Sequence, residues 1–311
     1  MIIKEKIEWR YCHFLKHRYP YLWCRRLYRK TFGKSANFSN PKDINEKILW
    51  MSFFTDTSIW SLLADKYAVR EYVKERISDD ILVPLLGKWD RTEDIDFDSL
   101  PLMFVIKPNN GSYDCVVVKD KSRVDCESIR ASMHRSLQIP FGYEHAERHY
   151  LDIKPCIIAE ELLEDPINSS PIDYKIWCLN GKLYCVFVVG NRNIINHTAD
   201  YACYDEDWKR RPELIAESFR STFECPRPKN LDLMIQYAEK LAEGLPQVRV
   251  DFYNIEGKIY FGEMTLTSNY GMMTYFTKEV LDEMGGLCVL PKRNFREKIS
   301  AFIKRWKPLV K

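Results

Sequence analysis

Charged residues on one predicted hairpin, over residues 248–265, give the clearest indication of chemistry in this sequence. The segment reads VRVDFYNIEGKIYFGEMT, and its first half alternates apolar residues with Arg249 and Asp251, as a half-buried strand does. On the returning strand, the same period predicts that Glu263 shares the apolar face with Phe261. Because unpaired buried charges are costly, the pattern indicates either a Mg²⁺ site at the two carboxylates or a structural ion-pair cluster.

Two lysines upstream are candidates for contacts with an anionic ligand. Lys66 falls within the apolar stripe of a helix predicted over residues 58–77, although its stem could also pack there while its head reaches water. A buried strand predicted at residues 102–106 leads to Lys107 and the loop PNNGSYD, whose N–H groups could surround phosphoryl oxygens. The loop is not a P-loop, because GxxxxGK[ST] is absent, and an ordinary hairpin with an exposed lysine is the alternative.

A second predicted hairpin, with strands at residues 173–179 and 182–189, carries further charges. Asp173 and Lys175 stand at its start, and Arg192 follows its end. The pattern is compatible with ligand contacts and equally with structural charge pairing.

The histidines and cysteines form no recognisable catalytic motif. His145 and His149 stand four residues apart, which suits a metal on a helix, but HExxH is absent and no third ligand is evident, so we expect ordinary polar residues. The ten cysteines form no CxxC pair, and we expect reduced, buried thiols. GxSxG is also absent, so the sequence predicts no protein nucleophile.

The remaining pattern predicts the elements that must position these residues. Amphipathic helical segments interrupted by Pro20 open the chain, and Asp43 or Asn45 could cap the next helix. Further helices are predicted at residues 127–137 and 231–245, a strand at 156–159, and an irregular connection at 199–230.

Composition indicates a globular protein with an uneven charge distribution. Of 311 residues, 46% are apolar, no apolar run approaches a membrane span, and no signal peptide opens the sequence, so we expect a cytoplasmic protein. The net charge of +3 divides into +8 over residues 1–34, +7 over residues 292–311 and −12 between them. The basic ends are either solvated helix faces or a peripheral contact with the inner membrane face. No nucleic-acid-binding module is present, so no nucleic acid partner is expected.

Taken in order, six segments resemble the ATP-grasp superfamily, and more closely its teichuronopeptide-synthesis-type (TupA-like) branch. They are NPKDINEKILW (40–50), ADKYAVREYV (64–73), FVIKPNNGS (104–112), IIAEELL (157–163), DYKIWCLNGK (173–182) and VRVDFYNIEGKIYFGEMT (248–265). The resemblance implies an α+β ATP-grasp fold, in which two α+β subdomains clasp ATP beside a helical N-terminal region. We therefore expect a helical region at residues 1–100, a subdomain with the phosphate loop at 101–165, and a C-terminal subdomain with the metal-binding hairpin and a basic helix at 166–311.

The resemblance also implies a role for each matching residue. Those expected to contact ATP are Lys66, Lys107, Asn109, Asn110, Gly111, Ser112, Glu160, Glu161, Leu162, Leu163, Asp173, Lys175 and Arg192. Within this set, residues 160–163 would form the adenine edge and Asp173 would approach the ribose. Arg249, Lys107 and Lys175 would assist phosphoryl transfer, whereas Asp251, Glu263 and Thr265 would hold two Mg²⁺ ions. Many superfamily members have Asn at the position of Thr265, and residues 267–271 also depart from the expected loop.

The function implied is an ATP-dependent carboxylate–amine ligase that forms an amide through an acyl phosphate. Its substrates would be an amino acid or other amine and a uronic-acid carboxylate, in bacterial capsule, exopolysaccharide or teichuronopeptide biosynthesis. Two alternatives remain at this point: a kinase or phosphotransferase that acts on a sugar or glycan, and a non-catalytic nucleotide-binding protein.

Overall fold

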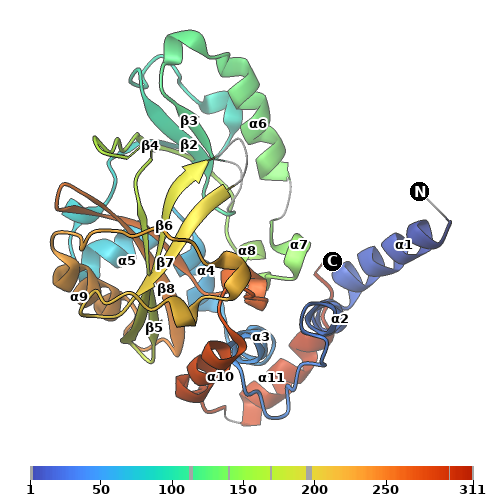
Figure 1. Cartoon of the computed structure of the whole chain (residues 1–311). Coiled ribbons are helices and arrows are strands. Elements are labelled where there is room, and N and C mark those ends of the chain that lie inside the picture. Colours follow the sequence, from blue (N-terminus) through green and yellow to red (C-terminus); the bar gives the residue numbers. More distant parts are fainter. Residues whose placement is uncertain are drawn as a thin grey trace.

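A computed structural model describes residues 3–111, 115–138, 141–168, 170–193, 198–293 and 295–309. Two antiparallel sheets with flanking helices make up its body, and further helices lie to one side (Figure 1). The architecture is α+β, as predicted. Short 3₁₀ helices connect the elements: η1 (Asp79–Ile81), η2 (Thr92–Asp94), η3 (Lys121–Arg123), η4 (Pro212–Leu214), η5 (Glu217–Phe219) and η6 (Ser268–Gly271).

The smaller sheet has four strands in the order β1-β4-β2-β3. Their bounds are Leu85–Trp89 for β1, Phe104–Pro108 for β2, Val116–Val118 for β3 and Ile157–Glu161 for β4. Helix α6 (Cys126–Gln138) packs on this sheet through Ile129 and Met133, which lie one turn apart and are buried. Strand β1 precedes residue 101, so this sheet begins before the subdomain boundary expected there.

The larger sheet has five strands in the order β7-β6-β5-β8-β9. Their bounds are Asp173–Leu179 for β5, Lys182–Asn193 for β6, Thr198–Tyr204 for β7, Gln247–Ile255 for β8 and Lys258–Thr265 for β9. Both predicted hairpins are confirmed, and helix α9 (Leu231–Leu241) contacts β5, β6 and β8. The predicted irregular connection at residues 199–230 is wrong at its start, because β7 pairs there with β6 although its sequence, TADYACY, shows little alternation.

A β-bulge in β9 corrects the predicted facing of the site hairpin. Asp251 pairs with Glu263, whereas Phe252 pairs with Phe261, which leaves Gly262 as the extra residue. The bulge reverses the alternation, so Met264 is buried and Glu263 is only partly buried. The prediction that Glu263 shares a face with Phe261 is therefore wrong. Glycine suits this position because a Cβ on residue 262 would lie 3.0 Å from the Asp251 carbonyl oxygen.

The chain between the sheets contains a second correction. One helix was predicted over residues 58–77, but the structure has α4 (Ser58–Ala64) and α5 (Val69–Arg76) with a break between them. In the break, the Asp65 carboxylate accepts hydrogen bonds from the backbone N–H groups of Tyr67 and Ala68 at 2.8 and 3.1 Å. This local bonding competes with a continuous helix. Two short helices follow, α7 (Gly142–His145) and α8 (Arg148–Leu151). Helix α8 contacts α4, and α7 contacts α8.

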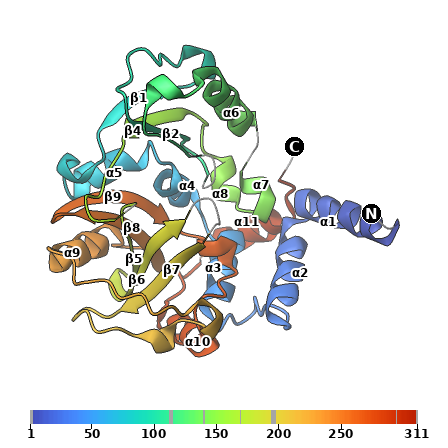
Figure 2. The ribbon, with the colours of Figure 1, turned by 45° about the horizontal axis from the view of Figure 1, so that its top comes forward.

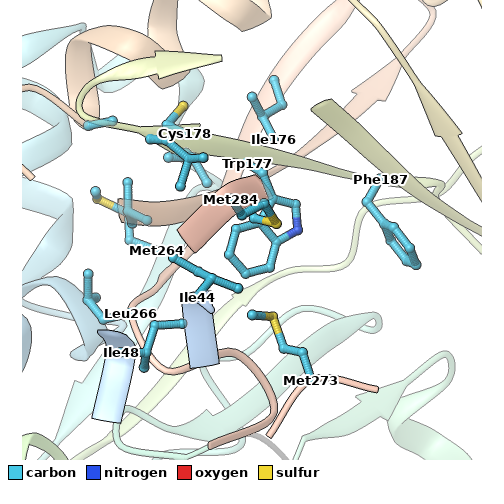
Figure 3. Close-up of a cluster of buried hydrophobic side chains, with 14 of the residues drawn as sticks. Ile44, Ile48, Ile176, Trp177, Cys178, Phe187, Met264, Leu266, Met273 and Met284 are labelled. Atoms are coloured by element: carbon cyan, nitrogen blue, oxygen red, sulfur yellow. The ribbon is translucent and has the colours of Figure 1, made fainter. Parts of the chain in front are cut away.

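The remaining helices lie beside the larger sheet (Figure 2). They are α1 (Ile3–Arg18), α2 (Pro20–Phe32), α3 (Ile44–Phe54), α10 (Lys278–Leu287) and α11 (Phe295–Trp306). Helix α1 projects away from the body (Figure 2). The Asp43 carboxylate caps α3 by accepting a hydrogen bond from the Glu46 N–H at 2.9 Å. Of the two candidate caps predicted for this helix, Asp43 is therefore the one used. Helix α3 is buried around nearly its whole circumference, and its Ile44 and Ile48 join Trp177, Met273 and Met284 in the main core (Figure 3).

Candidate active site

The register of the larger sheet sets three charged residues side by side. Lys175 of β5 pairs with Asp251 of β8, which pairs with Glu263 of β9. Lys175 Nζ lies 2.6 Å from Asp251 Oδ2 and 3.7 Å from Asp173 Oδ2. Since directly paired residues point to the same face of a sheet, the three side chains form one charged row.

Arg249 is the centre of this cluster. Its Nε and Nη2 donate to the two oxygens of Asp251 at 2.7 Å each, and Nη2 also lies 3.0 Å from Glu263 Oε1 and 3.1 Å from Thr265 Oγ1. Its Nη1 donates to Ser268 Oγ at 2.7 Å. Only a guanidinium has enough donors in one plane for these contacts.

The charges of the cluster shift one another's pKa values. Burial alone would lower the pKa of Arg249, but Asp251 and Glu263 outweigh it and raise this pKa above its usual value. For Glu263 burial alone would raise the pKa, but the positive charges of Lys66 and Arg249 lower it to about 2. Both groups are therefore charged at neutral pH.

The two predicted lysines reach the site from the other side. Lys66 lies in the break between α4 and α5, with Nζ 2.5 Å from the Gly111 carbonyl oxygen and 3.7 Å from Glu263 Oε2. Lys107, on β2, lies 2.6 Å from Glu160 Oε2 on β4. Burial lowers the pKa of Lys66. Lys66 thus connects the loop after β2 with the charged row of the larger sheet.

The loop after β2 is held at its base by Asn109. Its side-chain amide donates to Asp65 Oδ1 at 2.9 Å and to the Lys154 carbonyl at 3.1 Å, while its Oδ1 accepts the Cys156 N–H at 2.8 Å. The Asn109 side chain therefore shapes the loop. Asn110 is buried, and its Oδ1 accepts no hydrogen bond from the residues that the structure describes. Gly111 has φ +153°, and Ser112 lies outside the described residues.

The residues expected at the adenine edge differ in their surroundings. The Glu160 carboxylate is paired with Lys107 and with Arg70, whose Nη1 lies 2.9 Å from Oε1. The backbone of β4 is occupied on both sides by β1 and β2 through Glu161, whose N–H donates to the Pro84 carbonyl at 3.0 Å. Leu162 and Leu163 follow the strand and are half-buried. Backbone groups that could pair with an adenine base therefore begin only at residue 162.

At the other end of the row, Asp173 pairs with Arg192. The structure thus brings Asp173, Lys175, Asp251 and Glu263 together with Arg249, and it places Lys107 with Glu160 in the facing sheet.

Two side chains near this cluster, Tyr275 and Glu147, were not predicted. The Tyr275 hydroxyl lies 2.8 Å from Ser268 Oγ, and burial raises the pKa of Tyr275 to about 12. Glu147, between α7 and α8, accepts a hydrogen bond from Thr267 Oγ1 at 2.5 Å. The departure of residues 267–271 from the expected loop was the sequence signal for this region, but nothing in the sequence linked it to Glu147.

The two spaced histidines both pack against aromatic rings. His149 is buried against Trp60, with ring centroids 5.7 Å apart, and His145 stacks on Tyr270 at 3.7 Å. Within the described ranges, no group of three or more His, Cys, Asp or Glu side chains is placed to hold a metal ion.

We predict that Glu147 makes stability fall as pH rises. Burial raises its pKa from 4.5 to about 7, so the folded state binds this proton more tightly than the unfolded state does. The stabilisation is complete below about pH 4.5 and is lost as pH rises through about 7, by on the order of 3 kcal/mol. Urea unfolding of the wild type and Glu147→Gln at about pH 5 and pH 8 measures it: the substitution should remove this decrease. The exposed Glu75→Gln is the control, and an equal pH dependence in all three proteins would contradict the prediction.

The chain is an ATP-grasp protein, and Lys66 meets the Glu263 side of the Arg249 cluster as that class implies. The sequence model of the TupA-like ATPgrasp family matches residues 46–289, and the chain belongs to this family. The resemblance inferred from the six motifs is thereby confirmed.

Solved structures with a similar fold include three ligases or synthetases. D-alanine–D-alanine ligase from Bacillus anthracis is 15% identical, with 79% of this chain and 67% of that chain covered and a TM-score of 0.41. The ATP-grasp ligase PsnB complexed with minimal precursor is 12% identical, with 83% and 67% covered and a TM-score of 0.40. N5-carboxyaminoimidazole ribonucleotide synthetase from Thermus thermophilus is 11% identical, with 68% and 48% covered and a TM-score of 0.40. A search of curated proteins finds no match.

Proposed function

We propose that the protein phosphorylates a carboxylate with ATP and joins the resulting acyl phosphate to an amine. The observation that carries this proposal is the position of Lys66, which lies 3.7 Å from Glu263 while its Nζ contacts the loop after β2. The loop of the smaller sheet and the charged row of the larger sheet therefore meet at Lys66. Phosphoryl transfer of this kind needs positioned charges and no protein nucleophile, in agreement with the residues present.

The donor set fits Mg²⁺ bound together with ATP phosphates. Asp251 and Glu263 offer only carboxylate oxygens, which are the ligands that Mg²⁺ prefers, and Thr265 Oγ1 lies 3.0 Å from Glu263 Oε1. Mg²⁺ usually takes one or two carboxylates, and phosphate oxygens and water complete its shell, so a larger protein cluster is unnecessary. When bound, Mg²⁺ neutralises phosphate charge. We propose two ions here, with Asp251 and Glu263 as their main ligands and Thr265 beside them.

We assign roles to the other residues from their positions around Asp251 and Glu263. Lys66 and Lys107 bind phosphate oxygens, with Asn109, Asn110, Gly111 and Ser112 forming the loop beside them. Residues 160–163 receive the adenine, and Asp173 the ribose, while Lys175 and Arg192 lie next to the phosphates or the substrate. Arg249 stabilises charge on the transferring group through the donors that now contact Asp251 and Ser268.

For the substrates, we propose an amino acid or other amine and the carboxylate of a uronic-acid sugar or glycan, in surface-polysaccharide biosynthesis. An ADP-release screen of amines against uronic acids tests the reaction, with Asp251→Asn as the blank. Amide, ADP and phosphate are the expected products. A stable phosphoester would instead identify a kinase, and no Mg²⁺–ATP thermal shift would favour a non-catalytic protein. Activity that survives in Asp251→Asn would overturn the metal assignment.

We further propose that the cytoplasmic protein contacts the inner membrane face through its basic ends. Among the described residues, no helix is both long and apolar enough to cross a bilayer. Helix α11 instead carries exposed apolar side chains, which include Phe295 (76% exposed), Ile299 (48%) and Ile303 (63%), within a segment of net charge +7. An amphipathic basic helix of this kind suits an anionic lipid surface.

Replacing both Ile299 and Ile303 with serine should weaken binding to anionic liposomes by at least about tenfold, since each isoleucine loses the burial of its side chain in the interface. Sedimentation with phosphatidylserine-containing vesicles measures the bound fraction. Ile167→Ser, at a loop isoleucine that is 85% exposed, is the matched control and should bind like the wild type. Unchanged binding after removal of residues 1–30 and 292–311 would refute the membrane proposal.

A further inference from the structure

Glu147 is a buried carboxyl group to which the proposed reaction assigns no role. It is 7% exposed and lies between α7 and α8. Its Oε1 accepts one hydrogen bond, from Thr267 Oγ1 at 2.5 Å, and no Lys, Arg or His side chain among the described residues forms an ion pair with it. A buried carboxylate without a cation is costly, so a bound cation would stabilise its charged form.

The surroundings of Glu147 connect it to Arg249. Thr267 directly precedes Ser268, whose Oγ lies 2.7 Å from Arg249 Nη1. The backbone N–H of Tyr150 donates to the Glu147 carbonyl oxygen at 3.1 Å, and burial raises the pKa of the Tyr150 hydroxyl. Glu147 is therefore within the same set of side chains as the proposed site of phosphoryl transfer, on the side of the Ser268 contact.

Glu147 has a different neighbour on the side of α2. The thiol of Cys24 is buried, and its pKa rises to about 12 through burial first and through Glu147 second. The Cys24 thiol donates to the His145 carbonyl at 3.8 Å. The charge of Arg148 acts on this thiol in the opposite sense, and among the described residues no cation on this side forms an ion pair with Glu147.

We propose that Glu147 is the binding site for the amine substrate in its protonated form, with Thr267 and Tyr150 beside it. The ligand class is a primary or secondary amine that is charged at neutral pH. This inference rests on the proposed ligation, which requires such an amine. It assigns the amine to the side of Arg249 on which Ser268 contacts the guanidinium.

The chemistry balances as follows for a primary amine. The Glu147 carboxylate takes one proton from the ammonium group, which frees the nitrogen lone pair. Nitrogen then attacks the carbonyl carbon of the acyl phosphate, the C–N bond forms, and the C–O bond to phosphate breaks with its electron pair on phosphate. The second nitrogen proton passes to that phosphate, and Glu147 returns its proton to solvent.

Hydroxylamine separates the amine site from the first half of the reaction. It is largely uncharged near neutral pH, so it can trap an acyl phosphate without a carboxylate partner. In Glu147→Gln, which keeps an oxygen for Thr267, we expect KM for the amine to rise by about 10- to 100-fold. Hydroxylamine-supported ADP release should stay within about twofold of the wild type. Glu147→Asp, which keeps the charge, should recover part of the loss, and Glu75→Gln should match the wild type.

A binding measurement makes the test independent of turnover. Thermal unfolding of the wild type and Glu147→Gln is followed with a panel of amino acids and diamines, and only the wild type should be stabilised. An unchanged amine KM, equal loss of hydroxylamine and amine rates, or a thermal shift that persists in Glu147→Gln would overturn the inference. Failure of the ligase proposal would give a different result, because the wild type would then release no ADP with any uronic acid and hydroxylamine. In that case the thermal shift by amines, present in the wild type and absent in Glu147→Gln, would alone test the amine site.

Discussion

Replacing Arg249 with lysine is expected to lower kcat for ADP release by about 10²- to 10³-fold. The guanidinium contacts Asp251 with two nitrogens and reaches Glu263 and Ser268 as well. A lysine ammonium keeps the charge, but it presents three donors on a flexible stem and cannot reproduce this planar set. The loss should fall on kcat, because the guanidinium acts where charge develops during transfer.

Nucleotide binding provides the internal comparison for this variant. Lys66 and Lys107 remain, and Lys175 still pairs with Asp251 at 2.6 Å, so the thermal shift by Mg²⁺–ATP should be largely retained. Arg227→Lys is the matched control, since Arg227 pairs with Asp232 at the surface. A decrease in kcat of less than about tenfold, with the melting temperature unchanged, would show that Arg249 has a structural role only.

The second large effect is expected on stability, from Gly285→Ala in α10. A Cβ at this position would lie 2.0 Å from the Lys42 carbonyl oxygen and 2.6 Å from Asp43 Cα. Both atoms belong to the backbone at the start of α3, so the clash is relieved only if α10 moves away from α3. We expect the free energy of unfolding to fall by about 3 kcal/mol.

The adjacent glycine is a close control. A Cβ at Gly286 meets no atom within 4 Å, so Gly286→Ala should be neutral or stabilise the helix by about 0.5–1 kcal/mol. Urea unfolding of both variants gives the two free energies. Equal stability of the two variants would contradict the close packing of α10 on α3.

Residues with a strong local pattern were predicted well. The alternation around Arg249 and Asp251 and the turn residues after them predicted β8 and β9, and the lysine before a glycine loop predicted β2 and β3. Local pattern also predicted the Asp43 cap of α3. In each case, the interactions that determine the structure lie within a few residues along the chain.

The errors have a common physical origin in distant contacts. The break at Lys66 is fixed partly by its N–H bond to the Asn109 carbonyl at 3.0 Å, and β7 is a strand because β6 pairs with it. Glu147 meets Thr267 across 120 residues. None of these partners can be found from a single sequence by period or spacing, so the acceptor side of the site was the least predictable part.

The bulge at Gly262 divides β9 into two halves with opposite facing. Before the bulge Ile259 and Phe261 are buried. After it Met264 is buried, while Glu263 belongs to the charged row and Thr265 contacts Arg249. If Gly262 were paired in one regular ladder instead of forming the bulge, Glu263 would face the core and Met264 would face Arg249. Deletion of Gly262 would instead remove the bulge and keep both facings, so the bulge is one of two ways in which this strand can present Phe261 to the core and Glu263 to the site.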